Sequence, residues 1–205
     1  MADKKDVLRP SLWTPRPVKE TIAVYADWAD HYDAEVTARG YRTPDRLAAA
    51  LLAYAKKDAR ILDFGCGTGI GGAALRRAGF HTIDGTDVTA EMLKIATTRG
   101  IYRKTWNSTP DDMGFVAGSY AVIVAVGVVS LGAAPPETLA PLVAQLDADG
   151  LLALSFNDPT LKDQSYTDAL QSQVSQGLVE VVFREHGPHL DDVGMGSDVI
   201  VLRRL

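Results

Sequence analysis

Three closely spaced glycines follow an acidic residue in the stretch Arg60–Gly72, which reads R-I-L-D-F-G-C-G-T-G-I-G-G. An apolar pair precedes Asp63, and the glycines stand at positions 65, 67 and 69, before a helix-compatible stretch. Glycine accepts backbone angles that other residues resist, and it leaves main-chain N–H groups open to a ligand. At the carboxyl end of a parallel strand, such a turn is typical of a nucleotide-type site. The sequence therefore predicts a cofactor site here.

The same glycines fit two cofactor patterns. Read from Gly67, they give G-x-G-x-x-G, the dinucleotide fingerprint, and Asp87 lies near the distance at which that fingerprint places an acid. Read from Asp63, they give D-x-G-x-G-x-G. A nicotinamide-binding strand usually has an apolar residue where Asp63 stands, so the second pattern is favoured. An NAD-dependent oxidoreductase remains the weaker alternative, without an obvious Tyr-x-x-x-Lys pair.

The pattern D-x-G-x-G-x-G resembles motif I of the class I S-adenosylmethionine-dependent methyltransferases. The segment Gly85–Leu93, G-T-D-V-T-A-E-M-L, is similar to the second-strand signature of that family, G-x-D-x-S-x-E-M-L. The segment beginning at Tyr25 also looks like the start of small single-domain members, of which the Williams–Beuren-region methyltransferase-like group is the most similar. The resemblance extends to the C-terminus, but it is specific only in the two signatures.

This resemblance implies S-adenosyl-L-methionine as the cofactor and assigns roles to the matching residues. Asp63 would hold the methionyl amino group, directly or through water. Asp87 would accept hydrogen bonds from both ribose hydroxyls, which suits a carboxylate with two oxygens. The other expected cofactor contacts are Tyr25, Trp28, Tyr32, Gly65, Cys66, Gly67, Gly69, Val88, Met92, Asn107, Ser108, Val126 and Gly127.

Two acids that are common in the family are missing. Trp106-Asn107-Ser108 stands where many members have an Asp after the third strand, so Asn107 or Ser108 would substitute in the contact to the adenine amino group. Tyr120-Ala121 stands where Phe-Asp is common near the fourth strand. These departures keep open a third hypothesis, a protein that binds the cofactor without turnover.

Each of these residues also has a purely structural interpretation. The glycine loop would serve as a tight turn in any α/β protein, Asp87 could cap the following helix, and Cys66 is a small residue that fits between two glycines. The aromatic residues of the N-terminal helix stand at helical spacing, which is as typical of a core stripe as of a cover over a cofactor.

No catalytic residue or metal ligand is assigned from the sequence. The sulfonium already activates the methyl carbon, so a general base is needed only where the acceptor must lose a proton. His31, His186 and His189 titrate nearest to neutral pH, but nothing in the sequence orients them, and each is interpreted as a surface residue. The pair Asp191-Asp192 lacks the spacing of a metal site and is interpreted as a solvated loop.

The segment after the fourth strand bears on the acceptor. It reads G-V-V-S-L at Gly127–Leu131. Family members that act on amide or exocyclic amino nitrogens carry Asn/Asp-Pro-Pro-aromatic at this place. A small-molecule acceptor is therefore preferred, with a protein side chain as the second choice.

Composition places further bounds on function. The 205 residues carry a formal net charge of −5, so no basic surface for nucleic acid is visible. The single cysteine allows no internal disulfide, and the first residues lack the apolar core of a signal peptide. The most apolar run is too short to span a membrane. We therefore expect a cytoplasmic protein, without nucleic-acid or membrane partners, as a monomer or homodimer.

The elements that must position these residues alternate along the chain. Residues 1–17 are expected to form an arm and 18–57 two helices that make a lid, closing over a Rossmann-like core at 58–205. The predicted fold is a seven-stranded, mostly parallel sheet with an antiparallel last strand and helices on both faces. Strands are expected at about 60–64, 80–86, 101–105, 121–125, 151–156, 178–185 and 198–204.

Overall fold

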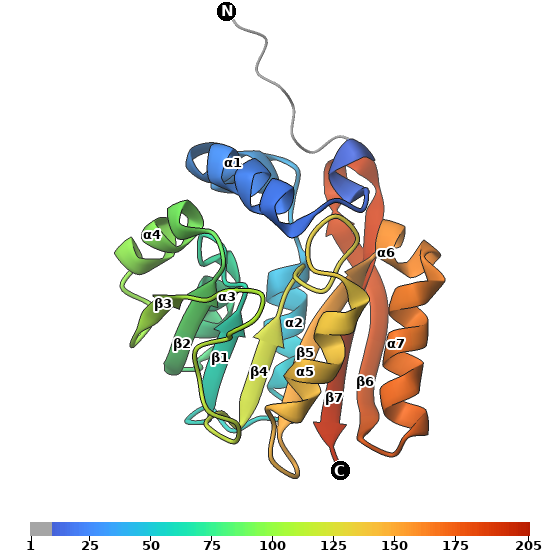
Figure 1. Cartoon of the computed structure of the whole chain (residues 1–205). Helices are drawn as coiled ribbons and strands as arrows, with labels where there is room; N and C mark the ends of the chain where they lie inside the picture. Colours follow the sequence, from blue (N-terminus) through green and yellow to red (C-terminus); the bar gives the residue numbers. More distant parts are fainter. Residues whose placement is uncertain (1–9) are drawn as a thin grey trace, which may run out of the picture.

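The computed structural model describes residues 10–205, which form a seven-stranded sheet with helices packed on both faces (Figure 1). Predictions for residues 1–9 of the arm lie outside the described residues. In chain order the strands are β1 Arg60–Phe64, β2 Thr82–Asp87, β3 Thr105–Asn107, β4 Val122–Ala125, β5 Leu151–Asn157, β6 Val179–Leu190 and β7 Met195–Arg204. Their order across the sheet is β3-β2-β1-β4-β5-β7-β6, and only β7 runs antiparallel to its neighbours. The predicted fold class is confirmed.

The helices lie on the two faces of this sheet and across its carboxyl edge. Their bounds are α1 Val18–Ala38, α2 Thr43–Leu51, α3 Ile70–Ala78, α4 Ala90–Thr98, α5 Leu139–Ala144, α6 Asp158–Lys162 and α7 Gln164–Ser175, with 3₁₀ turns η1 Pro10–Trp13, η2 Pro136–Thr138 and η3 Asp191–Val193. In Figure 1, α5 lies in front of the sheet, α2 behind it, and α1 above the carboxyl ends of β1 and β4. Among residues 10–205, no helix combines the length and apolar character needed to cross a membrane.

Strand alternation creates a separate apolar core on each face. Successive side chains of a strand point to opposite sides. In β4, Ile123 packs with the α5 and α7 side chains, whereas Val122 and Val124 pack with those of α2 and α3. The central strands are thus apolar on both faces, as parallel strands covered by helices require. We therefore expect the polar groups of a binding site in the loops at the carboxyl edge of the sheet.

The strand order changes direction between β1 and β4. The chain proceeds from β1 outward through β2 to β3, then returns to β4 and proceeds through β5 on the other side. At such a switch point the loops after the two strands diverge and leave a crevice at their carboxyl ends. The glycine loop follows β1 and therefore lines this crevice.

The structure corrects several predicted boundaries. The third strand begins at Thr105, and Tyr102, which was expected within it, donates its hydroxyl hydrogen to Asp63. The sequence pattern predicts one polar helix over about 161–176, and the structure divides this segment into α6 and α7. Asp163 separates them, since it has extended ψ and its carboxylate accepts a hydrogen bond from the Ser165 N–H.

The C-terminal hairpin also differs in detail. β6 continues through Gly187 and Pro188 to Leu190, where a Gly/Pro-rich loop was expected. Register shifts accompany this continuation, and proline is tolerated because β6 is an edge strand of the sheet. The turn itself is made by η3 and Gly194, which has a left-handed backbone. The pair Thr43-Pro44 predicts that Thr43 caps the helix that follows. In the structure Thr43 is instead the first residue of α2 and lies buried, with its hydroxyl directed to His189 and Ser197.

Candidate cofactor and acceptor site

A cavity of about 630 Å³ opens at the switch point, between the carboxyl ends of the central strands and α1. Ten of the predicted site residues line it: Tyr25, Tyr32, Gly65, Gly67, Asp87, Val88, Met92, Ser108, Val126 and Gly127. The remaining five do not: Trp28, Asp63, Cys66, Gly69 and Asn107. The cavity thus gathers residues from five separate segments of the chain.

Asp87 lies at the end of β2 and is held rigidly by main-chain donors. Its Oδ2 accepts a hydrogen bond of 2.7 Å from the Gly67 N–H, and its Oδ1 accepts one of 2.7 Å from the Thr89 N–H. Asp87 is only 8% exposed. Burial raises the pKa of its carboxyl group, although the hydrogen bonds from the main chain lower it. Each oxygen retains a further lone pair, so the carboxylate can still accept two hydroxyl groups.

Asp63 lies in β1, before the glycine loop, and is buried. It is 2% exposed, and its Oδ2 accepts a 2.7 Å hydrogen bond from the Tyr102 hydroxyl. Burial raises its pKa to about 7, although the hydrogen bonds from Tyr102 and the Gly72 main chain lower it. Its carboxyl group faces Tyr102 and the start of α3, and the contact with a methionyl amino group, directly or through water, stays a prediction.

The three glycines of the loop differ in what lies next to them. All three have positive φ, of 65°, 55° and 92° at Gly65, Gly67 and Gly69. A side chain at Gly65 would lie 2.5 Å from Val128, and one at Gly69 would lie 2.9 Å from Arg99. Next to Gly67 there is no atom within 4 Å of where a side chain would begin. Only Gly67 therefore leaves open space beside the main chain for a ligand.

Of the remaining predicted residues, Ser108 lines the cavity, whereas Asn107 and Cys66 do not. Ser108 is buried at the cavity wall, whereas Asn107 is exposed and its Nδ2 donates a 2.7 Å hydrogen bond to the Asp87 main-chain oxygen. Of the two candidates for the adenine amino contact, only Ser108 lines the cavity. Cys66 is buried against Gly85 and Tyr102, and burial raises the pKa of its thiol.

The aromatic residues of α1 have mixed roles. Trp28 is 2% exposed, its Nε1 donates to a Glu35 carboxylate oxygen, and its ring contacts Tyr32 edge-on. It is thus a core residue beneath the helix. Tyr25 and Tyr32 line the cavity, and burial raises the pKa of Tyr25 to about 12.

A cluster that sequence reasoning missed ties α1 to the glycine loop. The Asp33 carboxylate accepts a 2.5 Å hydrogen bond from the Thr68 hydroxyl and a second bond from the Arg99 guanidinium. Arg99 also donates to the Thr68 main-chain oxygen. Nothing in the local sequence connects Asp33 with Arg99, which lies 66 positions later. This cluster fixes α1 to the glycine loop.

Two buried oxygens test whether the cavity suits a polar ligand. Thr21 and Gln145 both line it, and their side-chain oxygens are buried without a hydrogen-bond partner among the described residues. Buried polar atoms in proteins nearly always have partners, so these positions are typical of a ligand site. Together with the Asp87 carboxylate and the open space at Gly67, they fit a nucleoside with a polar tail.

Comparison with known proteins decides between the cofactor patterns. A family model described as a methyltransferase domain matches residues 32–191. The chain belongs to the class I S-adenosylmethionine-dependent methyltransferases. Human methyltransferase-like protein 27 is 31% identical to this methyltransferase over 163 residues, which cover 77% of the chain and 65% of the human protein. The chain therefore spans somewhat less than two thirds of that relative.

Solved structures show the same methyltransferase fold at low identity. A magnesium protoporphyrin IX methyltransferase from Synechocystis, with SAH bound, superposes with a TM-score of 0.64 at 15% identity, covering 90% of this chain and 100% of that one. A putative methyltransferase from Haloferax volcanii, in complex with the Trm112 activator, gives 0.64 at 16% identity, covering 88% and 97%. At these identities the likeness concerns the fold alone.

Of the histidines and the acidic pair that the sequence placed at the surface, only His189 is buried. His31 is exposed, and His186 is half-exposed, with its Nδ1 2.9 Å from an Asp198 oxygen. His189, in contrast, is only 8% exposed, because β6 continues past Pro188 and packs it against Thr43. Burial and the nearby Arg46 lower its pKa to about 4, against a raising effect of Asp158. The pair at 191–192 is exposed and forms ion pairs with arginines at the end of α1 and before α2.

Proposed function

We propose that this methyltransferase transfers the methyl group of S-adenosylmethionine to a small-molecule acceptor. The observation that carries the proposal is the Asp87 carboxylate, fixed by two main-chain donors at the wall of the switch-point cavity. That arrangement sets two acceptor oxygens where a ribose would meet the glycine loop. When bound, the cofactor supplies an activated methyl group, which is the chemically demanding part of the reaction.

The chain's own residues would bind and orient. Asp87 would accept the ribose hydroxyls, Val88 and Met92 would flank the adenine, and Ser108 would serve the adenine amino group. Val126 and Gly127 would contribute main-chain groups at the end of β4. Tyr25 and Tyr32 would cover the site and exclude water, which strengthens polar contacts inside it. No general base is assigned, since an acceptor that carries a free lone pair needs none.

The small-molecule class is supported by the enclosure of the cavity. It lies beneath α1, and its volume of about 630 Å³ is in the usual range for pockets that hold small molecules. The net charge of −5 disfavours nucleic acid as the acceptor. We also propose that α1 and α2 form a lid over a single Rossmann-like core. The single cysteine suits a reducing compartment, and we propose that the protein is cytoplasmic.

Calorimetry with S-adenosylmethionine, S-adenosylhomocysteine and NAD tests the cofactor. We expect micromolar binding of the two adenosyl ligands and none of NAD; binding of NAD alone would refute the proposal. Methyl-labelled cofactor, incubated with a small-molecule extract and separately with a protein extract, then tests the acceptor class. Label should enter the small-molecule fraction. Label only in protein would overturn the acceptor class, and cofactor binding without any transfer would favour a non-catalytic binder.

A further inference from the structure

A second, small cavity of about 60 Å³ adjoins the first. The two share Tyr25, Tyr32, Gly127 and Ala133 in their walls. The small cavity extends from Gly127, at the end of β4, toward β5 and β6. It has space for roughly four water-sized groups. A cavity of this size accommodates one end of a molecule whose remainder lies in the larger cavity.

Asn157 lines the small cavity, and its hydrogen bonds show which of its amide atoms is occupied. Its Oδ1 accepts a 3.1 Å bond from the Thr160 N–H and a 2.7 Å bond from the Thr160 hydroxyl. The Thr160 oxygen itself accepts from the Leu131 N–H, which can only donate. These bonds fix which side of the amide is oxygen. Because Nδ2 has no partner among the described residues, Asn157 offers hydrogen-bond donors.

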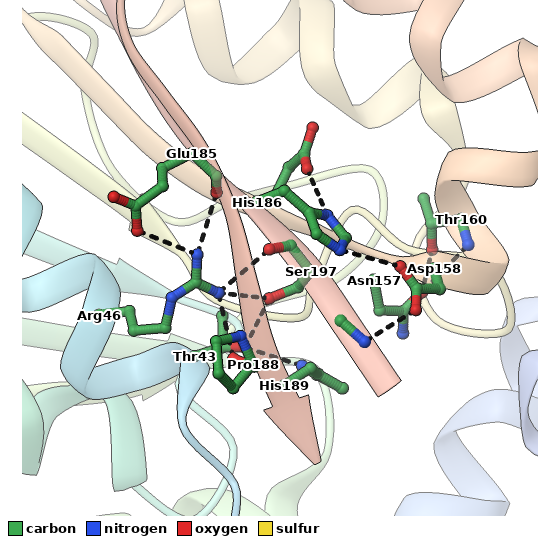
Figure 2. Close-up of polar contacts among 12 residues, drawn as sticks. Thr43, Arg46, Asn157, Asp158, Thr160, Glu185, His186, Pro188, His189 and Ser197 are labelled. Carbon is green, nitrogen blue, oxygen red and sulfur yellow. Dashed lines mark hydrogen bonds and ion pairs between the residues drawn. The ribbon is translucent and has the colours of Figure 1, made fainter. Parts of the chain in front are cut away.

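His189 is oriented by a chain of hydrogen bonds that begins at Arg46 (Figure 2). Arg46 donates to the Ser197 main-chain oxygen and, at 3.2 Å, to its hydroxyl oxygen. The Ser197 hydroxyl is buried, and among the described residues its hydrogen can reach only Thr43 Oγ1, at 2.8 Å. The Thr43 hydrogen is then directed to His189 Nδ1, also at 2.8 Å.

This chain determines the tautomer of the imidazole. A neutral ring carries one hydrogen, and if Nδ1 accepts, the hydrogen is on Nε2. Burial keeps the ring neutral, since it lowers the pKa of His189 to about 4. His189 lines the small cavity, with its ring edge-on to Tyr41. It therefore offers a second donor, Nε2–H, and it is not a base at neutral pH.

The rest of the wall is aromatic and uncharged. Trp13, Tyr25, Tyr32 and Tyr41 supply rings, and none of the described residues that line the cavity is charged. Taking a charged ligand group into such a wall costs far more than taking a neutral one, because no opposite charge compensates its lost hydration.

We propose that this small cavity binds one end of the acceptor, an uncharged, planar carbonyl group held between the tyrosine rings, to whose oxygen Asn157 Nδ2 and His189 Nε2 donate. The atom that takes the methyl group through its free lone pair, with S-adenosylhomocysteine as the leaving group, belongs to the remainder of the acceptor in the larger cavity. The inference rests on the proposed function, since it names the class of acceptor. In this arrangement Arg46, Ser197 and Thr43 are positioning residues. They act by keeping the hydrogen of His189 on the nitrogen that faces the acceptor.

Nitrogen NMR of the imidazoles tests the orientation in the unmodified protein. We expect His189 to be the neutral Nε2–H tautomer from pH 8 to below pH 5, and Thr43→Val to shift it toward a tautomer mixture. A Nδ1–H tautomer, or protonation near pH 6.5, would overturn the proposal.

Probe titrations test the chemical class, with acetophenone, benzoate and ethylbenzene as size-matched probes of a neutral carbonyl, a carboxylate and no oxygen. Acetophenone should bind at least tenfold more tightly than the other two. Asn157→Asp, which keeps the Thr160 contacts but replaces the donors, and His189→Phe should each weaken acetophenone about tenfold. His186→Gln, on the same strand with its partner outside the cavity, is the matched control and should change nothing.

Equal binding of the three probes, preference for benzoate, or unchanged affinity in both variants would overturn the subsite. The titrations are made with and without S-adenosylhomocysteine. If the nucleoside fails to bind, the proposed function fails, while the probe affinities still decide the subsite. Competition between acetophenone and the nucleoside would also overturn it, because the acceptor and the cofactor must be bound together.

Discussion

The Asp87 carboxylate has two separable tasks, and one substitution can distinguish them. It accepts main-chain hydrogen bonds from the glycine loop and from the start of α4, and it is proposed to accept the ribose hydroxyls. In Asp87→Ala both kinds of contact are lost. A hydrogen bond to a charged group contributes about 1.5–3 kcal/mol. Two such bonds are lost, and relief from burying the charge offsets part of their sum, so we expect the free energy of unfolding to fall by about 2–4 kcal/mol.

The Asp87→Ala substitution should also weaken binding of the cofactor. Loss of the ribose contacts should cost roughly 2–3 kcal/mol of binding free energy, which corresponds to about a 30- to 150-fold rise in the Kd of S-adenosylhomocysteine. Asp87→Asn retains one oxygen and should lie between the wild type and Asp87→Ala on both measures. Urea denaturation gives the first quantity. Calorimetry, at a temperature where every variant is folded, gives the second.

Asp163 supplies the matched control, since its carboxylate accepts the Ser165 N–H at the start of α7 and does not line the cavity. Asp163→Ala should lose about 1 kcal/mol of stability and leave the Kd unchanged. If Asp87→Ala lost stability but bound the nucleoside within twofold of the wild type, Asp87 would be only a structural cap. The assignment of the ribose contact would then be wrong.

Three further substitutions test the structure around the loop. Asp63→Asn should become more stable relative to wild type as pH rises from about 4 to 7, by up to roughly 4 kcal/mol, because the folded state must then ionise a carboxyl group whose pKa is about 7. Urea denaturation across pH measures this. Asp33→Ala should release α1 and raise the dissociation rate of S-adenosylhomocysteine about two- to fivefold in stopped flow, with under about 1 kcal/mol lost in stability. Gly72→Ala would place a side chain 2.3 Å from the Tyr102 hydroxyl and should cost about 1–3 kcal/mol in thermal unfolding.

Each of these has a result that counts against it. For Asp63, the sign follows from the folded state holding its proton to higher pH than the unfolded chain; a stability difference that is flat from pH 4 to 7 contradicts it. For Asp33, the control is Asp45→Ala, which removes an exposed ion pair with Arg77 away from the cavity, and an equal rise in both variants would refute the tether. For Gly72, a gain in stability would mean that Tyr102 moves away freely.

The sequence by itself determined the sheet and one wall of the site. Strand and helix periodicity are local properties, and the two signatures each lie on one continuous segment, the glycine loop after β1 and the turn after β2. Gly67, Asp87, Val88 and Met92 could therefore be assigned from local sequence patterns alone. Where the segments were short or polar, as at β3 and α6–α7, local patterns were weak and the expected boundaries were wrong.

Only the tertiary structure decided which chemically suitable residues meet. Asp63 and Tyr102 are 39 positions apart, and Thr43 and His189 are 146 apart, so no local pattern links them. Burial of the Asp63 carboxyl group against Tyr102 could not be predicted from the local sequence, and its contact with the cofactor stays a prediction. His189 was expected at the surface, but β6 extended past a proline and buried it. Side-chain direction, burial and hydrogen-bond partners arise from packing between distant segments, and the proposed acceptor subsite depends on all three.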